Sequence, residues 1–313
     1  MISLKKLILL IFIFMILMPG CTREAALPVD NSGKISIVTT KFAVYDFARE
    51  IAGGNADITL LIPPGSESHS YELTPQDTVK IQNCNLFAYV GGVSDMWVDK
   101  TLNSMDTGKM RIVTLTDCIA LVREEIVEGM EDDDDDDIPY DEHIWTSPAN
   151  AKLIVQKLSD AICAADKENA DLYIQNTAAY IEKLDDLDVA FKAVIGDANR
   201  RTIVFGDRFP FRYFSDAYGL RYFAAFSGCS SDTEPSAKTV AFLIDKVKDE
   251  HIPVVFHIEL SSERIADTIC EATGAKKMLL HSCHNISKAD FNKGVSYLEL
   301  MIKNAAALKE ALT

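Results

Sequence analysis

Three histidines in three separate motifs are the residues of this chain best suited to chemistry. His69 stands in SESHSYELTPQD, His143 in DEHIWTSPANA and His281 in LLHSCHN, and the whole chain has only six histidines. Neutral imidazole is the commonest protein metal ligand. A divalent metal site takes three or four ligands, which a fold brings together from distant segments. The three motifs therefore predict a metal site.

The net charge of the chain also favours a cation as its ligand. The chain has 31 basic and 47 acidic residues, which gives a net charge of −16. This excess argues against nucleic acid or an anionic membrane surface as the ligand. One acidic run is dense enough for its like charges to keep it unstructured, and it either gathers cations weakly or is only a solvated loop. Its aspartates are Asp132, Asp133, Asp134, Asp135, Asp136 and Asp137.

The N-terminus reads as a secretory signal. Lys5 and Lys6 precede an apolar run of about a dozen residues, which is shorter than the roughly 20 residues that a membrane-spanning helix needs. The run ends at Met18 and is followed by Pro-Gly-Cys21. This ending resembles a bacterial lipoprotein signal, which implies cleavage before Cys21 and a lipid on its sulfur. An ordinary cleaved signal is the alternative. We predict a signal at 1–20, a flexible tether at 21–34 and a lipid-anchored domain on the extracytoplasmic face of the cell membrane.

Strand-like and helix-like segments alternate along the rest of the chain. The strand-like runs are ISIVTT, ADITLLIP, LFAYVGG and RIVTLTD in the first half, and TIVFGD, YFAAF, PVVFHIE and KKMLLH in the second. This order predicts an α/β fold with open parallel sheets. Between the halves, a stretch almost without helix breakers predicts a short helix to about Ala165 and a long helix from about Lys167. A last helix is expected at about 288–311.

The long helix would be about 40 Å in length for roughly 28 residues, which is enough to bridge two lobes, although two ordinary packed helices are the alternative. We predict two βα lobes with parallel sheets, at 35–165 and 199–313, joined by a long rigid helix at 166–198. In open α/β sheets ligands bind beyond the carboxyl ends of the strands. The ligand cleft is therefore expected between the lobes.

Three motifs resemble the zinc- and manganese-binding lipoproteins of bacterial ABC importers. They are HSYELTPQD, DEHIWTSPANA with the acidic loop before it, and EPSAKTVAFLIDKVKD, and the similarity covers about 35–313. The first histidine of the family follows a Pro-Gly-x-x-x-His pattern, which Pro64 to His69 matches. The second stands in a motif that His143, Trp145 and Pro148 match. The resemblance implies two lobes on a rigid helix, a metal cargo and an ABC permease in the membrane as partner.

The chain departs from the family at the other two ligands. The third is usually a histidine, but the corresponding segment VFGDRFPFRYFSDAYGL has none. Arg208 stands there by one count and cannot ligate, whereas Asp207 could ligate, or Arg208 could pair with an acidic ligand. The fourth family ligand is a carboxylate, at whose place His281 stands. The site implied is His69, His143 and His281, with water or one of Asp207, Cys229, Cys283 and His284 as a further ligand.

The cysteines leave two readings open. Cys229 and Cys283 both follow strands of the second lobe, so both should lie near the edge of the cleft. In an oxidising compartment we expect a disulfide between them, and thiolate ligation of the metal is the alternative. Cys84, Cys163 and Cys270 lie in apolar or helical settings and are expected to be buried thiols.

A site of three imidazoles suits zinc best. Manganese sites of the family generally have more carboxylate, so manganese is the alternative cargo. We expect a monomeric binding protein that captures the metal and docks on the permease. A secreted metalloenzyme and a surface adhesin are the other classes considered. The chain has no HExxH motif and no Gly-x-Ser-x-Gly elbow, so a binding protein is expected rather than an enzyme.

Overall fold

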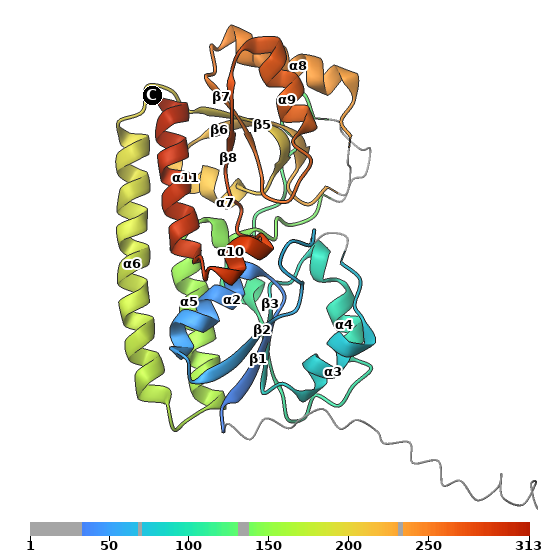
Figure 1. The fold of residues 1–313 in the computed structure, drawn as a ribbon, viewed down its shortest axis with the longest axis vertical. Coiled ribbons are helices and arrows are strands. Elements are labelled where there is room, and N and C mark those ends of the chain that lie inside the picture. Colours follow the sequence, from blue (N-terminus) through green and yellow to red (C-terminus); the bar gives the residue numbers. More distant parts are fainter. Residues whose placement is uncertain (1–32, 68–70, 131–137, 231–233) are drawn as a thin grey trace, which may run out of the picture. The chain divides into compact units, whose positions relative to one another are not determined.

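The structure is a computed structural model that describes residues 33–67, 71–130, 138–230 and 234–313. Within these residues the strands form two parallel four-stranded sheets, one from each half of the chain (Figure 1). The first sheet has the order β2-β1-β3-β4. Its strands are β1 (Ile35–Thr39), β2 (Ala56–Leu60), β3 (Leu86–Tyr89) and β4 (Arg111–Thr114).

The second sheet repeats the topology of the first, with the order β6-β5-β7-β8 and every pairing parallel. Its strands are β5 (Thr202–Phe209), β6 (Arg221–Ser227), β7 (Val254–His257) and β8 (Lys276–Leu279). All the strand-like runs of the sequence are therefore strands, and the prediction of two parallel α/β lobes is confirmed. The register of β5 against β6 shifts between Phe205 and Arg208, just before the strand ends.

The helices of the first half begin and end at residues that favour helix ends. The helix α2 (Phe42–Ala52) ends at Gly53, which takes the left-handed conformation with φ 55°. The helix α3 (Pro75–Asn83) begins with a capping box, in which Thr74 accepts from the backbone N–H of Asp77 and the Asp77 side chain accepts in return. A short helix, α4 (Trp97–Leu102), follows β3.

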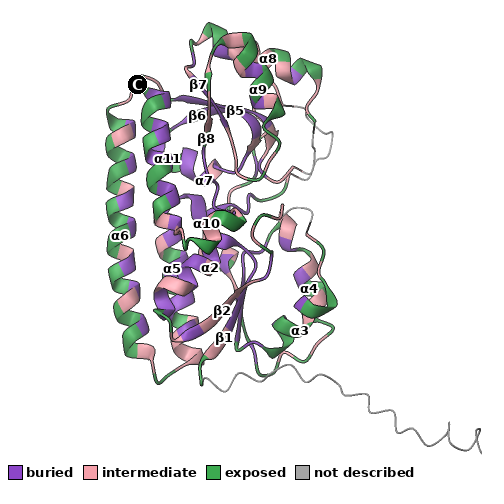
Figure 2. Ribbon diagram, viewed as in Figure 1, coloured by how far each residue is buried: buried purple, intermediate pink, exposed green. Residues whose placement is uncertain are grey.

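A shorter and a longer helix follow the first sheet, as the sequence predicts. They are α5 (Pro148–Ala165) and α6 (Ala170–Gly196). The 27 residues of α6 span about 40 Å. It packs against α5 and α2 of the first half, and against α7 (Arg212–Tyr218) and α11 (Tyr297–Leu312) of the second. The long bridging helix is therefore present, and in Figure 2 its buried residues form a stripe along one side.

The remaining helices belong to the second half and include one error of prediction. The helices α8 (Ala237–Asp249) and α9 (Arg264–Thr273) alternate with strands as expected. The single helix expected at about 288–311 is wrong, because the structure has α10 (Lys288–Asn292) and α11 instead. Gly294 takes φ 72° between them, and Ser296 forms a capping box with Glu299 that starts α11 afresh.

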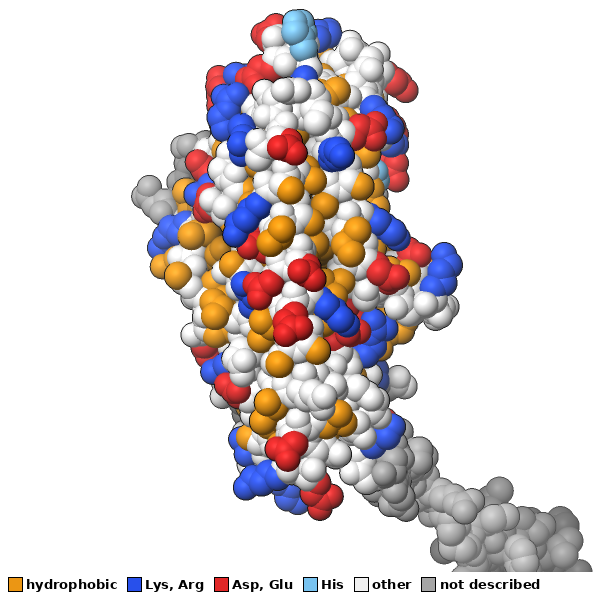
Figure 3. Space-filling view, turned by 90° about the vertical axis from the view of Figure 1, so that its left-hand side faces the viewer, with side chains coloured by type: hydrophobic (Ala, Val, Ile, Leu, Met, Phe, Trp, Pro, Cys, Tyr) orange, Lys and Arg blue, Asp and Glu red, His pale blue; other side chains and the backbone are white. Residues whose placement is uncertain are grey.

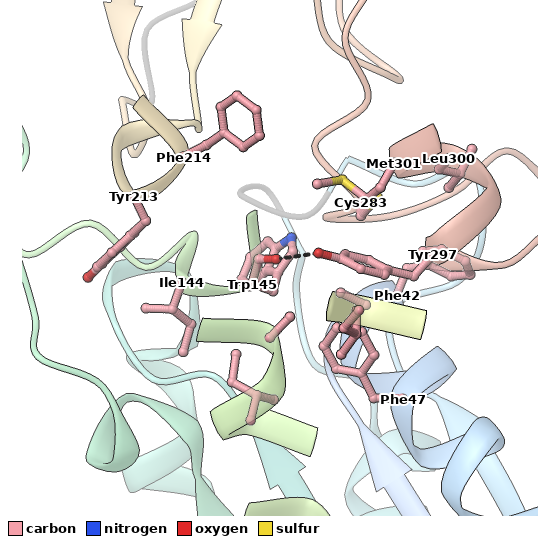
Figure 4. Packing of buried hydrophobic residues seen from close by; sticks show 14 of the residues in the cluster. Phe42, Phe47, Ile144, Trp145, Tyr213, Phe214, Cys283, Tyr297, Leu300 and Met301 are labelled. Atoms are coloured by element: carbon pink, nitrogen blue, oxygen red, sulfur yellow. Dashed lines mark hydrogen bonds between the residues drawn. The ribbon is translucent and has the colours of Figure 1, made fainter. Parts of the chain in front are cut away.

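One hydrophobic core runs through both halves. It contains Phe47 and Trp145 from the first half and Phe205 and Tyr297 from the second. The hydroxyl of Tyr297 donates to the carbonyl of Trp145 at 2.7 Å, the contact that is dashed in Figure 4. A shared close-packed core resists relative movement, so the two sheets are fixed to each other by packing as well as by α6.

The outer face beside α6 is mixed in character. Figure 3 shows hydrophobic side chains scattered there among acidic and basic ones, as on an ordinary solvated surface. None of the described helices is both long enough and apolar enough to span a membrane.

Candidate metal centre

A small pocket lies where segments of the two halves meet. His143 lines it from the first half, and Gly228, Glu259, Ser282 and His284 line it from the second. These residues follow the carboxyl ends of strands or precede a helix. The pocket is therefore at the place in the fold where the sequence predicts a ligand site.

His143 is a fully buried member of this pocket. It stands just before a 3₁₀ turn (Ile144–Thr146) that leads into α5, and it is 0% exposed. The Asp141 carboxylate accepts from the backbone N–H of His143 at 2.6 Å and lies 3.0 Å from Nδ1. A carboxylate at Nδ1 fixes the ring and directs Nε2 towards a ligand. Burial lowers the pKa of His143, but the charge of Asp141 and its hydrogen bond outweigh burial, so the net shift is upward.

His284 lies next to His143. The two rings meet edge to face with their centroids 5.2 Å apart, and His284 also packs on Trp145. The loop that carries His284 is held from the first half, where the first N–H groups of α2 donate to it. Phe42 donates to the carbonyl of His284 at 3.0 Å and Ala43 donates to that of Cys283 at 3.2 Å. These bonds satisfy helix-end donors that would otherwise lack partners.

Glu259 holds the same loop from the second half. It follows β7, and its carboxylate accepts from the backbone N–H of Ser282 at 2.7 Å, from the Ser282 hydroxyl at 2.7 Å and from the N–H of His284 at 3.1 Å. Hydrogen bonds to a carboxylate are stronger than neutral ones. The position of His284 is therefore fixed from both halves of the molecule.

Two groups of residues in this region have ligand atoms within 4.8 Å of one another, and His143 belongs to both. The first group adds Glu142 and His284. The Glu142 carboxylate accepts from the N–H of Ser94 at 2.8 Å and from its hydroxyl, and it lies 3.9 Å from the Lys41 ammonium. Lys41 is fully buried, so it compensates the charge of Glu142 inside the protein.

The second group adds Glu124 and Cys229. Glu124 accepts from the backbone N–H of Gly228 at 2.9 Å and of Cys229 at 3.1 Å. A Cβ on Gly228 would lie 2.8 Å from the carbonyl oxygen of Phe209 and 3.3 Å from the His143 ring, so only glycine lets the loop approach this closely. Burial and the charge of Asp141 raise the pKa of Glu124. Burial and the nearby carboxylates raise the pKa of the Cys229 thiol.

The structure brings His284 rather than His281 to His143. The Nδ1 of His281 accepts from the backbone N–H of Cys283 at 3.0 Å. Asn304 accepts from the N–H of His281 and donates to its carbonyl, both at 2.8 Å. His281 therefore shapes the loop and belongs to neither group among the described residues.

Other predicted residues lie at or near the pocket in different roles. Asp207 accepts from the N–H of Ile258 at 3.1 Å and from the Ser261 hydroxyl, so it ties β5 to the end of β7. The Arg208 guanidinium lies 3.7 Å from Glu67, which belongs to neither ligand group of the described residues, so the pairing of Arg208 with an acidic ligand stays a prediction. His69, Cys21 and the aspartates from Asp132 to Asp137 fall outside the described residues.

The expected disulfide between Cys229 and Cys283 is not formed in the structure, where both are free thiols. Cys283 is 0% exposed and belongs to the shared core that Figure 4 shows, whereas Cys229 adjoins Glu124 and His143. The two thiols therefore have different surroundings although both follow strands of the second half. Sequence reasoning missed Glu124, because its segment VREEIVEG shows several acidic residues and nothing that selects one of them.

The family that this chain matches and two of its curated relatives have names that refer to zinc. Residues 37–311 match the family described as zinc-uptake complex component A, periplasmic. The chain is 34% identical over 281 residues to the zinc-binding lipoprotein AdcA of Streptococcus pneumoniae, covering 89% of this chain and 56% of AdcA. It is 31% identical over 292 residues to the high-affinity zinc uptake system protein ZnuA of Bacillus subtilis, covering 90% and 89%. The chain thus spans little more than half the length of AdcA.

The fold also matches a solved structure. The crystal structure of the Zn(II)-bound ZnuA-like domain of Streptococcus pneumoniae AdcA aligns with a TM-score of 0.75 at 32% identity. The alignment covers 90% of this chain and 99% of that one. The part of AdcA that this chain resembles is therefore a complete two-lobed domain.

Proposed function

Given that the chain belongs to the family of zinc-uptake complex component A, periplasmic, we propose that it captures a divalent transition metal, with zinc as the favoured cargo. Capture takes place in the pocket between the two halves, and the metal is then delivered to an ABC importer. Binding and release, rather than catalysis, are the proposed activity. Manganese remains the alternative cargo.

The observation that carries this proposal is buried negative charge around His143. Glu124, Asp141 and Glu142 are all less than 10% exposed, and Lys41 pairs with Glu142. Among the described residues, neither Glu124 nor Asp141 has an ion pair with a lysine or arginine, and the His143 ring beside Asp141 compensates its charge only when protonated. Burying carboxylates without a compensating cation is unfavourable. A divalent metal bound at His143 supplies that compensation.

Imidazoles are the proposed core of the ligand set. His143 presents Nε2 because Asp141 holds Nδ1, and His284 replaces His281 as the ligand from the loop after β8. His69 is retained as a proposed ligand on the strength of its Pro-Gly-x-x-x-His motif. Three imidazoles with a carboxylate nearby form a donor set of the kind that zinc prefers.

Delivery requires the protein to stay near the membrane. The name of AdcA describes a lipoprotein, which supports the proposal that Cys21 carries a lipid after cleavage of residues 1–20. The proposed partner is the membrane permease of an ABC importer, contacted by both halves at once. Because the pocket lies between the halves, residues of both halves would surround a bound metal.

Metal content and zinc affinity test this function. The full chain should bind one zinc, measured by elemental analysis after exhaustive dialysis and by competition with a chromophoric chelator. His143→Ala should weaken zinc binding by more than the roughly 10–100-fold that loss of an outer partner costs, because it removes a ligand. His257→Ala, in β7, is the matched control and should bind as the native chain does. A native chain that retains no zinc contradicts the proposal.

A further inference from the structure

The group formed by Glu124, His143 and Cys229 has features that the general proposal of metal capture does not use. Its three members come from the segment after β4, the turn before α5 and the loop after β6. Their ligand atoms lie within 4.8 Å of one another, and the group contains a thiol as well as an imidazole and a carboxylate. These are the three chemical types that zinc binds in proteins.

The carboxylate of this group is poorly compensated compared with that of the other group. Glu142 has the Lys41 ammonium 3.9 Å away and both the N–H and the hydroxyl of Ser94 as donors. Glu124 accepts from the two backbone N–H groups of Gly228 and Cys229 and from the Cys229 thiol, and no lysine or arginine of the described residues forms an ion pair with it. Backbone donors carry no net charge. Of the two carboxylates, Glu124 is therefore the one with more to gain from a cation.

The backbone around Cys229 is built for this contact. The two N–H groups that Glu124 accepts belong to Cys229 and to the residue before it, so the carboxylate fixes the loop that carries the thiol. Gly228 leaves no side chain between that loop and the His143 ring, where a Cβ would lie 3.3 Å from the ring. Cys229 is thus held against His143 by contacts that a merely buried thiol would not need.

We propose that Sγ of Cys229 is a zinc ligand, together with Nε2 of His143 and an oxygen of Glu124. This inference rests on the proposed function and assigns the thiol of its site. On binding, the S–H bond breaks, the sulfur electron pair forms the Zn–S bond and the proton leaves to solvent. The fourth position is left to an imidazole of the proposed function, of which His284 lies beside His143. A thiolate is a soft ligand, which favours zinc over manganese in this chain.

X-ray absorption at the zinc edge of the loaded full chain tests the proposal. A Zn–S distance of about 2.3 Å is clearly longer than Zn–N distances of about 2.0–2.1 Å, so one sulfur neighbour should be resolved. Cys229→Ser should lose it, and the ratio of zinc to manganese affinity should fall by roughly tenfold or more, the direction set by loss of a soft ligand. Cys270→Ser in α9, whose side chain is also partly buried, is the matched control and should keep the sulfur signal.

A second measurement needs no variant. Iodoacetamide labelling of the native chain, mapped to individual cysteines by mass spectrometry, should be slowed by zinc at Cys229 and restored by a chelator, with no zinc effect at Cys270. Stoichiometric zinc without a sulfur neighbour, or with unprotected Cys229, overturns the thiolate assignment and leaves metal capture standing. Absence of stoichiometric zinc overturns the proposed function itself. A sulfur signal that persists in Cys229→Ser also overturns the assignment.

Discussion

The two halves of the molecule share a strand order but contribute differently to the pocket. Both sheets place their first strand second in the order, as β2-β1-β3-β4 and β6-β5-β7-β8. The first half provides Glu124, Glu142 and His143 from the long segment between β4 and α5. The second half provides short loops directly after its strands, carrying Cys229 after β6, Glu259 after β7 and His284 after β8.

The first half mainly supplies charge to the pocket, whereas the second half mainly supplies loops whose positions are fixed by hydrogen bonds. The first half contains the carboxylates of both ligand groups and the buried ammonium of Lys41, which compensates Glu142. The second half contributes loops whose places are set by hydrogen bonds to the backbone, several of them from the first half. The same topology thus supplies buried charge from one half and ligand loops held in place by hydrogen bonds from the other.

Removing the ammonium should have the largest effect on the first half. Lys41→Met leaves Asp95 and Glu142 buried without their cation, since Lys41 lies 3.6 and 3.9 Å from them. Breaking a buried pair in this way costs about 3–5 kcal/mol, to be measured by chemical denaturation of the metal-free chain at neutral pH. Lys109→Met, at an exposed site, should change stability little. A loss below about 1 kcal/mol for Lys41→Met would show that this charge is not needed.

The contact between the halves at Asp46 should give stability a distinct pH dependence. Asp46 in α2 accepts from the N–H of Tyr297 at 2.7 Å. Burial raises its pKa to about 6, against the opposing effect of Arg49. The folded state therefore holds the proton of the Asp46 carboxyl group more tightly than the unfolded state does. The stabilisation that this proton gives the folded state is complete below about pH 4 and is lost as pH rises through 6.

The size of this dependence follows from the shift. Two pKa units correspond to about 3 kcal/mol. The free energy of unfolding of the native chain, compared with Asp46→Asn, should therefore fall by about 3 kcal/mol between pH 4 and pH 7.5. Denaturation curves at several pH values measure it. Native and variant curves that stay parallel over this range would refute the role given to Asp46.

Loosening a loop of the second half should weaken metal binding more than it weakens the fold. Glu259→Gln replaces a charged acceptor of three hydrogen bonds by an amide that can supply only one oxygen. Loss of an outer partner of this kind lowers metal affinity by roughly 10–100-fold, measured by chelator competition. Glu271→Gln, exposed on α9, is the control. Unchanged zinc affinity in Glu259→Gln would show that Glu259 does not position the loop that carries His284.

Much of this architecture was predictable because burial leaves its mark on local sequence. Parallel strands buried on both faces are short apolar runs, and each such run became a strand. The break between α10 and α11 was missed because apolar spacing continues across it, although Gly294 and Ser296 carry the signals of a helix end and a new start. The apolar spacing predicted one helix, although Gly294 and Ser296 indicate a break in it.

The site was less predictable because its partners meet only in the folded chain. His143 stood out by its motif. His284 and His281 share one motif, and only the path of the backbone separates them. Cys283 between them takes φ 60°, and the turn there directs Nδ1 of His281 back to the loop. Glu124 and Cys229 are 105 residues apart, and no sequence spacing links them.

Anomalous diffraction at the zinc edge from crystals of the zinc-loaded chain tests the central claim most directly. The account predicts one strong peak about 2.0–2.1 Å from Nε2 of His143, between the segment that carries Glu124 and the loops that carry Cys229 and His284. A zinc peak that lies away from His143, with Nε2 bound to no metal, would contradict it.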